Sequence, residues 1–257
     1  MSISESLYFV YNSISSKDMG ILNVSKSEGL QQEIFLPERE IKEVTIRNCN
    51  RPYFQSIISK PLILDLRFAF ENRWNEESIR NVARWLYQDF YKEMYFSDNP
   101  ERKFYTMYIG SYNLLHNNLK QGYVEGQWRN IDDCSYSHVY FSPIYDLTSN
   151  PASGTEISIT NNGDLPMPIL INTQIINGSS FSITNISDAG KSISFTGLDV
   201  AEVLEVNTEN ESITSTSSYR YNNMEGEFLL LNRGISRLLI KGKIKLQFQY
   251  QFRLLQS

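Results

Sequence analysis

The sequence predicts a mainly β protein in two parts. We expect an N-terminal β-rich domain with one main α-helix, an α+β arrangement, followed by a C-terminal β-sandwich. Three observations predict this fold class. The chain has sixteen Tyr and fourteen Phe among its 257 residues, and these side chains suit half-buried pleated surfaces. One segment of the first half has the spacing of an amphipathic helix. The second half contains only short alternating segments separated by turns.

Short strands are expected through most of the first 70 residues. The clearest lies in the stretch PLILDLRFAFEN, where every second residue is large and apolar. Alternation of this kind directs one face of a strand into a core. The side chains expected on that buried face are Leu62, Leu64, Leu66, Phe68 and Phe70.

The predicted helix spans residues 76–94, EESIRNVARWLYQDFYKEM. Asn75 suits the N-cap, because its side-chain oxygen can accept a hydrogen bond from a free amide of the first turn. Acidic residues follow it, at the positive end of the helix dipole. Trp74 precedes the cap and can pack on Ile79 as a hydrophobic staple. The apolar residues on the main face are Ile79, Val82, Ala83, Leu86 and Phe90.

Three further aromatic residues of this segment, Trp85, Tyr87 and Tyr91, lie off the main apolar face. Two interpretations are open. The rings can pack under neighbouring loops of the same domain, or they can form a contact between subunits. Tyr and Trp serve both purposes, because each combines a large apolar surface with a polar group.

The polar stretch DLTSNPASGT, residues 146–155, is the expected domain boundary. It places an N-terminal domain at 1–148 and a C-terminal domain at 149–257. Beyond it, strands are expected on both sides of the turn Asn161-Asn162-Gly163-Asp164. The final stretch, IKLQFQYQFRL, alternates most regularly, with Phe248 on the apolar face and Gln247 on the polar face. About 105 residues of such strands are typical of a β-sandwich.

The sequence offers little catalytic chemistry. His116 and His138 have no Cys or second His at a metal-ligand spacing. Asp132-Asp133-Cys134 could form a cation site or a reactive thiol, but a turn between two strands is the favoured interpretation. Cys49 and Cys134 do not make a disulfide framework. No phosphate-binding loop, nucleophile elbow or zinc pattern is present. We therefore expect no enzyme, and no catalytic, cofactor-binding or metal-binding residues.

The net charge of −5 and the pI of about 5.2 argue against a general nucleic-acid binder, which needs a basic surface. No apolar run approaches 18 residues, so membrane insertion is not expected. The N-terminal MSISESLYFVYN lacks the basic and long apolar regions of a secretory signal. We expect synthesis and folding in a cytoplasm.

Five stretches, taken in order, carry a resemblance to a known family. SSKDMGI resembles an early signature of that family, and ARWLYQDFYKEMYFSDNPERKFYTMYIG resembles its helix, turn and Tyr-rich strand. VYFSPIYDL resembles the end of the family's first domain. ISITNNGDLPMPILI and GEFLLLNRGISRLLIKG resemble the opening and the close of its second domain. The family is that of the distal tail proteins of siphophages, the bacteriophages with long flexible tails.

The resemblance implies a structural virion protein at the distal end of the phage tail, assembled in the host cytoplasm. The first domain would form a hexameric ring, possibly one of several stacked rings, around a channel through which DNA only passes. The second domain, a galectin-like or carbohydrate-module-like sandwich, would project outward. The expected partners are the tail tube protein, the tail tip or tail-associated lysin, and receptor-binding proteins. Candidate ring contacts are the aromatic residues Trp85, Tyr91 and Tyr105.

A second function remains open from the sequence. A carbohydrate-binding module or host-wall adhesin would also have a sandwich fold and many aromatic residues. Against it, the tyrosines are spread through both halves of the chain rather than gathered in one set of loops.

For the ring of the tail protein family, the negative charge fits a channel with an acidic or neutral wall, because a basic lining would retain DNA phosphates.

Overall fold

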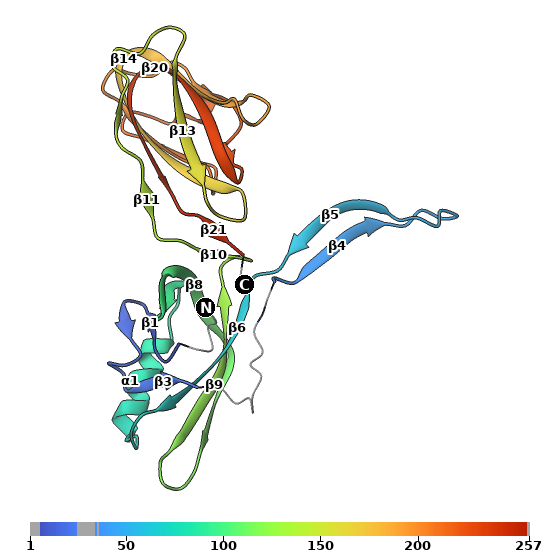
Figure 1. Ribbon diagram of the computed structural model, residues 1–257, viewed down its shortest axis with the longest axis vertical. Coiled ribbons are helices and arrows are strands. Elements are labelled where there is room, and N and C mark those ends of the chain that lie inside the picture. Colours follow the sequence, from blue (N-terminus) through green and yellow to red (C-terminus); the bar gives the residue numbers. More distant parts are fainter. Residues whose placement is uncertain (1–5, 25–33, 35, 256–257) are drawn as a thin grey trace. The chain divides into compact units, whose positions relative to one another are not determined.

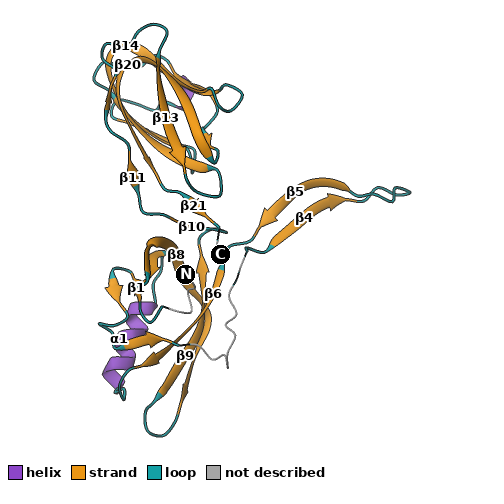
Figure 2. Cartoon of the chain, viewed as in Figure 1, coloured by secondary structure: helices purple, strands orange, loops and turns teal. Residues whose placement is uncertain are grey.

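The computed structural model describes residues 6–24, 34 and 36–255 (Figure 1). The chain divides into two compact units. Unit 1 comprises residues 1–136 and 255–257, and unit 2 comprises residues 137–254. Strands dominate both units, and one α-helix occurs among the described residues, in unit 1 (Figure 2). The predicted fold class, mainly β with an α+β first part and a sandwich after it, is confirmed.

Unit 1 is built on an antiparallel sheet with the strand order β2-β1-β7-β8-β9-β6-β3. Its strands are β1 (Phe9–Tyr11), β2 (Ile14–Ser15), β3 (Ile21–Asn23), β6 (Ile63–Phe70), β7 (Lys92–Phe96), β8 (Asn99–His116) and β9 (Gly122–Asn130). Strand β10 (Ser135–Tyr136) pairs with β8. The remaining elements are a separate hairpin of β4 (Arg39–Val44) and β5 (Tyr53–Ser59), and the helix α1 (Glu76–Leu86).

The core of unit 1 lies between α1 and the sheet. Val82, Trp85 and Leu86 of the helix pack in one cluster with side chains from β1, β6, β7, β8 and β9. The alternation predicted for β6 is confirmed at Leu64, Leu66 and Phe68, all of which are buried. The other buried members of the cluster are Phe9, Tyr11, Ile21, Leu62, Met94, Phe96, Phe104 and Trp128.

The helix begins as predicted and ends early. Asn75 caps it, and its side chain accepts a hydrogen bond from the amide of Ser78 at 2.7 Å. The helix stops at Leu86 rather than at residue 94, because Tyr87 adopts an extended backbone. Met94 then enters strand β7, where it is fully buried and pairs with both β1 and β8. Sheet pairing therefore overrides the helical spacing of residues 87–94, and Phe90 is left exposed.

Unit 2 is organised around two long strands, β14 (Met167–Asn185) and β20 (Gly234–Tyr250), which pair along most of their length. The other strands are β11 (Tyr140–Phe141), β12 (Tyr145–Asp146), β13 (Thr155–Asn161), β15 (Lys191–Phe195), β16 (Val203–Asn207), β17 (Ser212–Ser215), β18 (Met224–Gly226), β19 (Leu230–Leu231) and β21 (Arg253–Leu254), with a 3-10 turn η2 at Tyr221–Asn223.

The predicted alternation of the C-terminal strand is confirmed. Ile244, Leu246 and Phe248 are fully buried in the core of unit 2. The strands predicted around the turn at 161–164 are β13 and the start of β14. Asn161 organises that turn, because its buried amide donates to the carbonyls of Leu165 and Leu231, both at 2.9 Å. Its side-chain oxygen accepts from the amide of Gly163.

The division between the units falls after Tyr136, before the expected boundary at 148. Strands β11 and β12 cause this difference, because both pair with β20. Ser142 exchanges two hydrogen bonds with Phe248, one through its amide and one through its hydroxyl. Asn150 donates to the carbonyls of Ile240 and Gly242, so the polar stretch 146–155 is fastened to unit 2.

Candidate functional site

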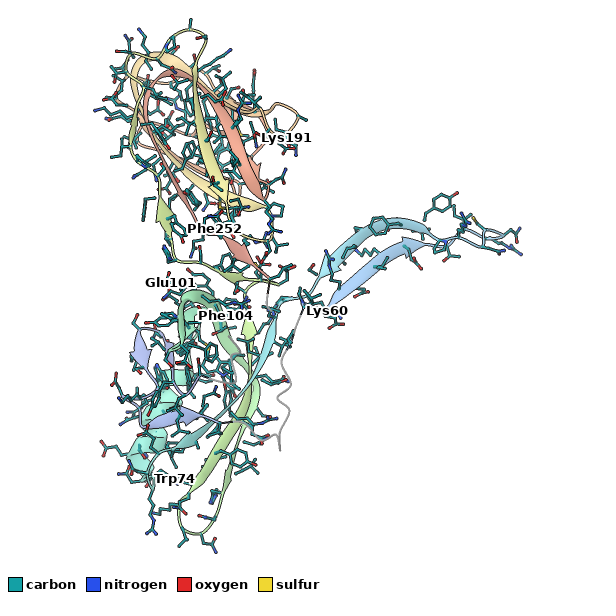
Figure 3. The ribbon with its side chains drawn as sticks, viewed as in Figure 1. Lys60, Trp74, Glu101, Phe104, Lys191 and Phe252 are labelled. Carbon is teal, nitrogen blue, oxygen red and sulfur yellow. The ribbon has the colours of Figure 1, made fainter. Side chains whose placement is uncertain are left out.

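The hairpin β4–β5 is the most unusual surface of unit 1. Its two strands form a sheet of their own and pair with no other described strand. All residues of β4 are exposed, and so are all residues of β5 except the last. Lys60 lies at its base (Figure 3), where the ammonium group forms an ion pair with Glu38 at 2.7 Å. The exposed apolar residues of the two strands are Ile41, Val44, Tyr53, Phe54, Ile57 and Ile58.

Both faces of the hairpin are apolar. Ile41 lies opposite Ile57, and Val44 lies opposite Tyr53. Successive residues of a strand point to opposite faces, so Ile41 and Val44 face opposite sides. Ile41 is 61% exposed and Phe54 is 64% exposed, unlike residues on the core side of a folded strand. Contiguous exposed apolar surface of this kind marks an interaction site.

The loop that joins β4 to β5 is basic. Residues 45–52, TIRNCNRP, contain Arg47 and Arg51 and no carboxylate. Cys49 is in this loop, and its thiol donates to the carbonyl of Arg51 at 3.4 Å. The sequence predicts short strands in this part of the chain, but it does not predict that both faces of β4 are exposed. Alternating apolar residues give the period of a strand, whereas burial depends on distant parts of the fold.

A second apolar surface lies beside the helix. A cavity of about 580 Å³ opens between α1 and the strands β6, β8 and β9. Its lining includes Phe70, Ile79, Ala83, Tyr108, Leu114 and Val124. We call it the α1 groove. Ala83 was predicted on the main apolar face of the helix, and the structure leaves it exposed at the α1 groove.

The three aromatic residues that were predicted as subunit contacts of the hexameric ring have different surroundings. Trp85 is buried at 4% exposure, stacks on Phe9 and donates its indole N–H to the carbonyl of Tyr11 at 2.9 Å. It is therefore a core residue, and the expectation that it forms a subunit contact is wrong. Tyr91 is half-buried, and its hydroxyl accepts a hydrogen bond from Arg129. Tyr105 is half-buried and stays a candidate.

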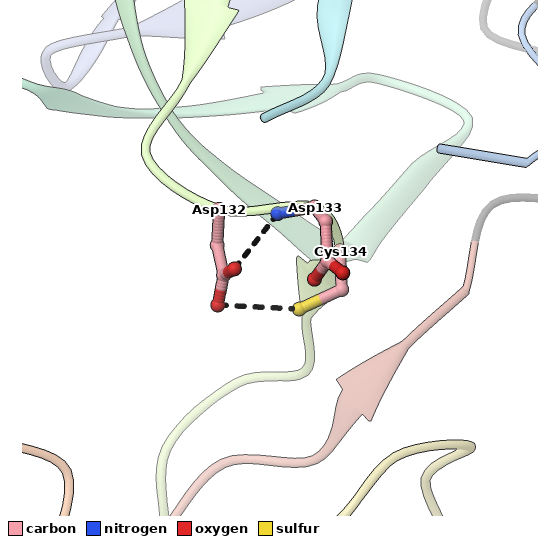
Figure 4. Close-up of side chains that lie close together, drawn as sticks. All are labelled: Asp132, Asp133 and Cys134. Carbon is pink, nitrogen blue, oxygen red and sulfur yellow. Dashed lines mark hydrogen bonds between the residues drawn. The ribbon is translucent and has the colours of Figure 1, made fainter. Parts of the chain in front are cut away.

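Asp132, Asp133 and Cys134 lie in the bend between β9 and β10, as the turn interpretation expected (Figure 4). Their potential ligand atoms lie within 4.8 Å of one another. One carboxylate oxygen of Asp132 accepts from the amide of Asp133 at 2.8 Å. The other accepts from the hydroxyl of Tyr136 at 2.8 Å and from the thiol of Cys134 at 3.7 Å. These hydrogen bonds stabilise the bend, and this local structural role explains why the three residues lie close together.

The two histidines lie in different units, and each packs beside an aromatic ring. His116 contacts Trp74 with ring centroids 5.8 Å apart, and His138 lies 4.0 Å from the ring of Tyr140. Each histidine therefore has an aromatic neighbour within its own unit. Among the residues that the structure describes, no helix combines the length and the apolar character of a membrane span.

Comparisons with known proteins agree with this fold. Residues 4–130 match the family model described as the phage tail protein N-terminal domain. The SPbeta prophage-derived protein YomH of Bacillus subtilis strain 168 is 31% identical over 255 residues, which are 98% of this chain and 100% of the relative.

Two phage structures resemble the chain over nearly its whole length. The Dit protein of phage SPP1, described as a hub of the adsorption apparatus, aligns with a TM-score of 0.73 and 11% identity, covering 97% of this chain and 100% of that one. A chain of the phage P2 baseplate in its activated conformation aligns with a TM-score of 0.53 and 8% identity, covering 96% and 97%. The protein therefore belongs to the same family as the prophage-derived protein YomH, carries a match to a phage tail protein N-terminal domain at residues 4–130, and shares the fold of SPP1 Dit.

Proposed function

We propose that this protein is a hub at the distal end of a siphophage tail. Six copies form a ring that joins the tail tube protein to the tail tip or tail-associated lysin and to receptor-binding proteins. The ring encloses a channel through which DNA passes. The protein is assembled in the host cytoplasm and becomes part of the virion. Family membership and the fold shared with SPP1 Dit support this role.

The exposed hairpin β4–β5 is the observation that carries the proposal. A two-stranded hairpin alone in water is marginally stable, and it gains stability only by packing against something else. Here six large apolar side chains are distributed over both faces and are exposed to solvent. Burying such side chains stabilises by about 25 cal/mol per Å² of apolar surface. The hairpin is therefore suited to lie between subunits.

The α1 groove is the second surface that a ring requires. A closed ring uses heterologous contacts, in which one patch on each subunit meets a different patch on the next. The hairpin supplies exposed apolar side chains, and the groove supplies an apolar recess in the same unit. In our proposal the hairpin of one copy packs at the groove of the next copy.

Two variants test this assembly in the full chain. Replacing Ile41 and Ile57 together by Asp places charges on one face of the hairpin, and Ala83→Arg fills the groove. Both changes lie at exposed positions, so each subunit should stay folded. Ser56→Asp is the matched control, because it adds a charge at an exposed polar position of the same hairpin. Mass photometry should show rings for the wild type and the control, and smaller species for the two variants.

Circular dichroism of each variant separates loss of assembly from loss of folding. If the double Asp variant forms rings as well as the wild type does, the hairpin is not the ring contact. If only Ala83→Arg assembles normally, the hairpin packs elsewhere on the neighbouring subunit.

A further inference from the structure

We propose that unit 2 carries a binding site for neutral hexopyranosides on the exposed rings of Tyr219 and Tyr221. The two rings stack with their centroids 5.0 Å apart and an interplanar angle of 29°. Tyr219 is 70% exposed and Tyr221 is 37% exposed. The pair thus presents flat aromatic surface to solvent. This site does not depend on ring formation.

Tyr221 is fixed in place by two hydrogen bonds. Its hydroxyl accepts from the amide of Ile213 at 3.0 Å and donates to the carbonyl of Glu211 at 3.3 Å. Glu211 lies in the turn between β16 and β17, and Ile213 is the second residue of β17. The ring edge is therefore anchored, and Tyr219 stacks on an immobilised neighbour.

Arg220 lies between the two tyrosines in sequence and points the other way, into the protein. It is 7% exposed and forms a two-pronged ion pair with Glu202, with both N–O distances at 2.7 Å. It also donates to Asp199 and to the carbonyl of Gly197, both at 2.9 Å. The buried guanidinium holds the loop backbone from beneath, so the exposed rings sit on a rigid support.

This rigidity favours ligand binding. Tyr offers a large contact area with few rotatable bonds, and immobilising it in advance lowers the entropy lost when a ligand binds. Tyr221 also supports the β16–β17 turn through its hydroxyl, whereas Tyr219 is 70% exposed and packs on the ring of Tyr221. The Arg220–Glu202 ion pair and the hydrogen bonds of the Tyr221 hydroxyl keep this loop and its rings in place before a ligand binds.

The surroundings select a neutral sugar over other ligands. The negative face of an aromatic ring attracts the C–H groups on one face of a pyranose. Exposed Glu209, Asn210 and Glu211 lie in the turn that contacts the edge of Tyr221, and their side chains can hydrogen-bond sugar hydroxyls. The two carboxylates would repel the phosphates of a nucleic acid. A stable protein interface buries about 1,200–2,000 Å², far more than two rings provide.

Saturation-transfer-difference NMR on the full chain tests the site. The probes are methyl β-glucopyranoside, methyl β-galactopyranoside and methyl N-acetyl-β-glucosaminide at millimolar concentration. Wild type should transfer saturation to the ring C–H protons of at least one glycoside. Tyr219→Ala should weaken that binding about tenfold, whereas Tyr219→Phe should retain it because the ring stays.

Phe141→Ala is the matched control, because Phe141 is an exposed aromatic residue of unit 2 that belongs to a different segment. It should bind like the wild type. Absence of saturation transfer from all three glycosides, or equal transfer with Tyr219→Ala, would overturn the proposal. So would preferential binding of choline, since the site would then be a cation–π site. None of these outcomes bears on whether the chain forms a ring.

Discussion

The buried pair Glu202–Arg220 makes the stability of unit 2 depend on pH. Burial by itself would raise the pKa of Glu202. Hydrogen bonds from Arg220, from the amide of Asp199 and from the hydroxyl of Ser215 favour the carboxylate, and together they lower that pKa from its usual 4.5. The unfolded chain therefore binds the proton more tightly. The contribution of Glu202 is complete above about pH 4.5 and is lost as the pH falls through the lowered value.

We expect the urea midpoint of unit 2 to fall between pH 5 and pH 3 in the wild type. Glu202→Gln should lower the midpoint at pH 7, because Arg220 loses the buried one of its two charged partners and keeps only the exposed Asp199. It should also reduce the pH dependence. Glu225→Gln, at an exposed position, is the control and should change neither. An unchanged pH dependence in Glu202→Gln would show that another group is responsible.

Substitution of Phe248 measures how much one core side chain contributes to the stability of unit 2. It is fully buried in the middle of β20 and packs with the ring of Tyr145. Phe248→Ala should cost about 3–5 kcal/mol of unfolding free energy, since it removes a large ring and leaves a cavity. Lys243→Ala on the same strand, where the side chain is exposed, should cost under about 0.5 kcal/mol. Chemical denaturation measures both, and similar losses would contradict the assignment of the two faces.

Among the secondary-structure elements, helix α1 begins where the residues at its own N-terminus place it. Asn75 and Ser78 form a reciprocal capping box, with the amide of Asn75 donating to the hydroxyl of Ser78 at 3.0 Å. Asn75→Ala should therefore lower the unfolding free energy by about 1 kcal/mol. Asn72→Ala, in the exposed segment before the cap, is the comparison and should have little effect. Equal losses would mean that tertiary packing alone sets the start of the helix.

The same helix shows where sequence patterns stop being informative. Its cap was predictable because a capping box involves neighbouring residues. Its end was not, because residues 92–96 pair with β1 and β8, and nothing local records those partners. The strands β6 and β20 were predictable from alternation. The double-sided exposure of β4–β5 and the outward rings of Tyr219 and Tyr221 were not, since exposure depends on the rest of the fold.

At the scale of the whole molecule, the extent of the second folding unit stays a prediction. Composition placed its start after residue 148, whereas contacts place the division after Tyr136. A fragment of residues 137–254 contains β11, β12 and the buried Leu147, and a fragment of 149–257 lacks them. The longer fragment should unfold cooperatively at the higher urea concentration. Equal midpoints would mean that β11 and β12 add nothing to the unit.

The charge of the proposed channel is also a whole-molecule prediction. The net charge is −5, and we expect an acidic or neutral channel wall that does not retain DNA. Residues 45–52 of the hairpin are the local exception, with two arginines and no carboxylate. We therefore expect this loop to lie away from the channel. The position of this loop in an image reconstruction of the ring checks this expectation, and a channel lined by Arg47 and Arg51 would show that its wall is basic instead.

The proposed hub requires that copies of this chain assemble into a six-membered ring. Mass photometry of the purified chain at rising concentration, followed by negative-stain electron microscopy, measures this directly. We predict particles of six chains of 29.8 kDa each, seen as rings with a central hole. If the protein stays monomeric at tens of micromolar and forms no ring when tail tube or tail tip protein is added, the chain is not a ring-forming hub.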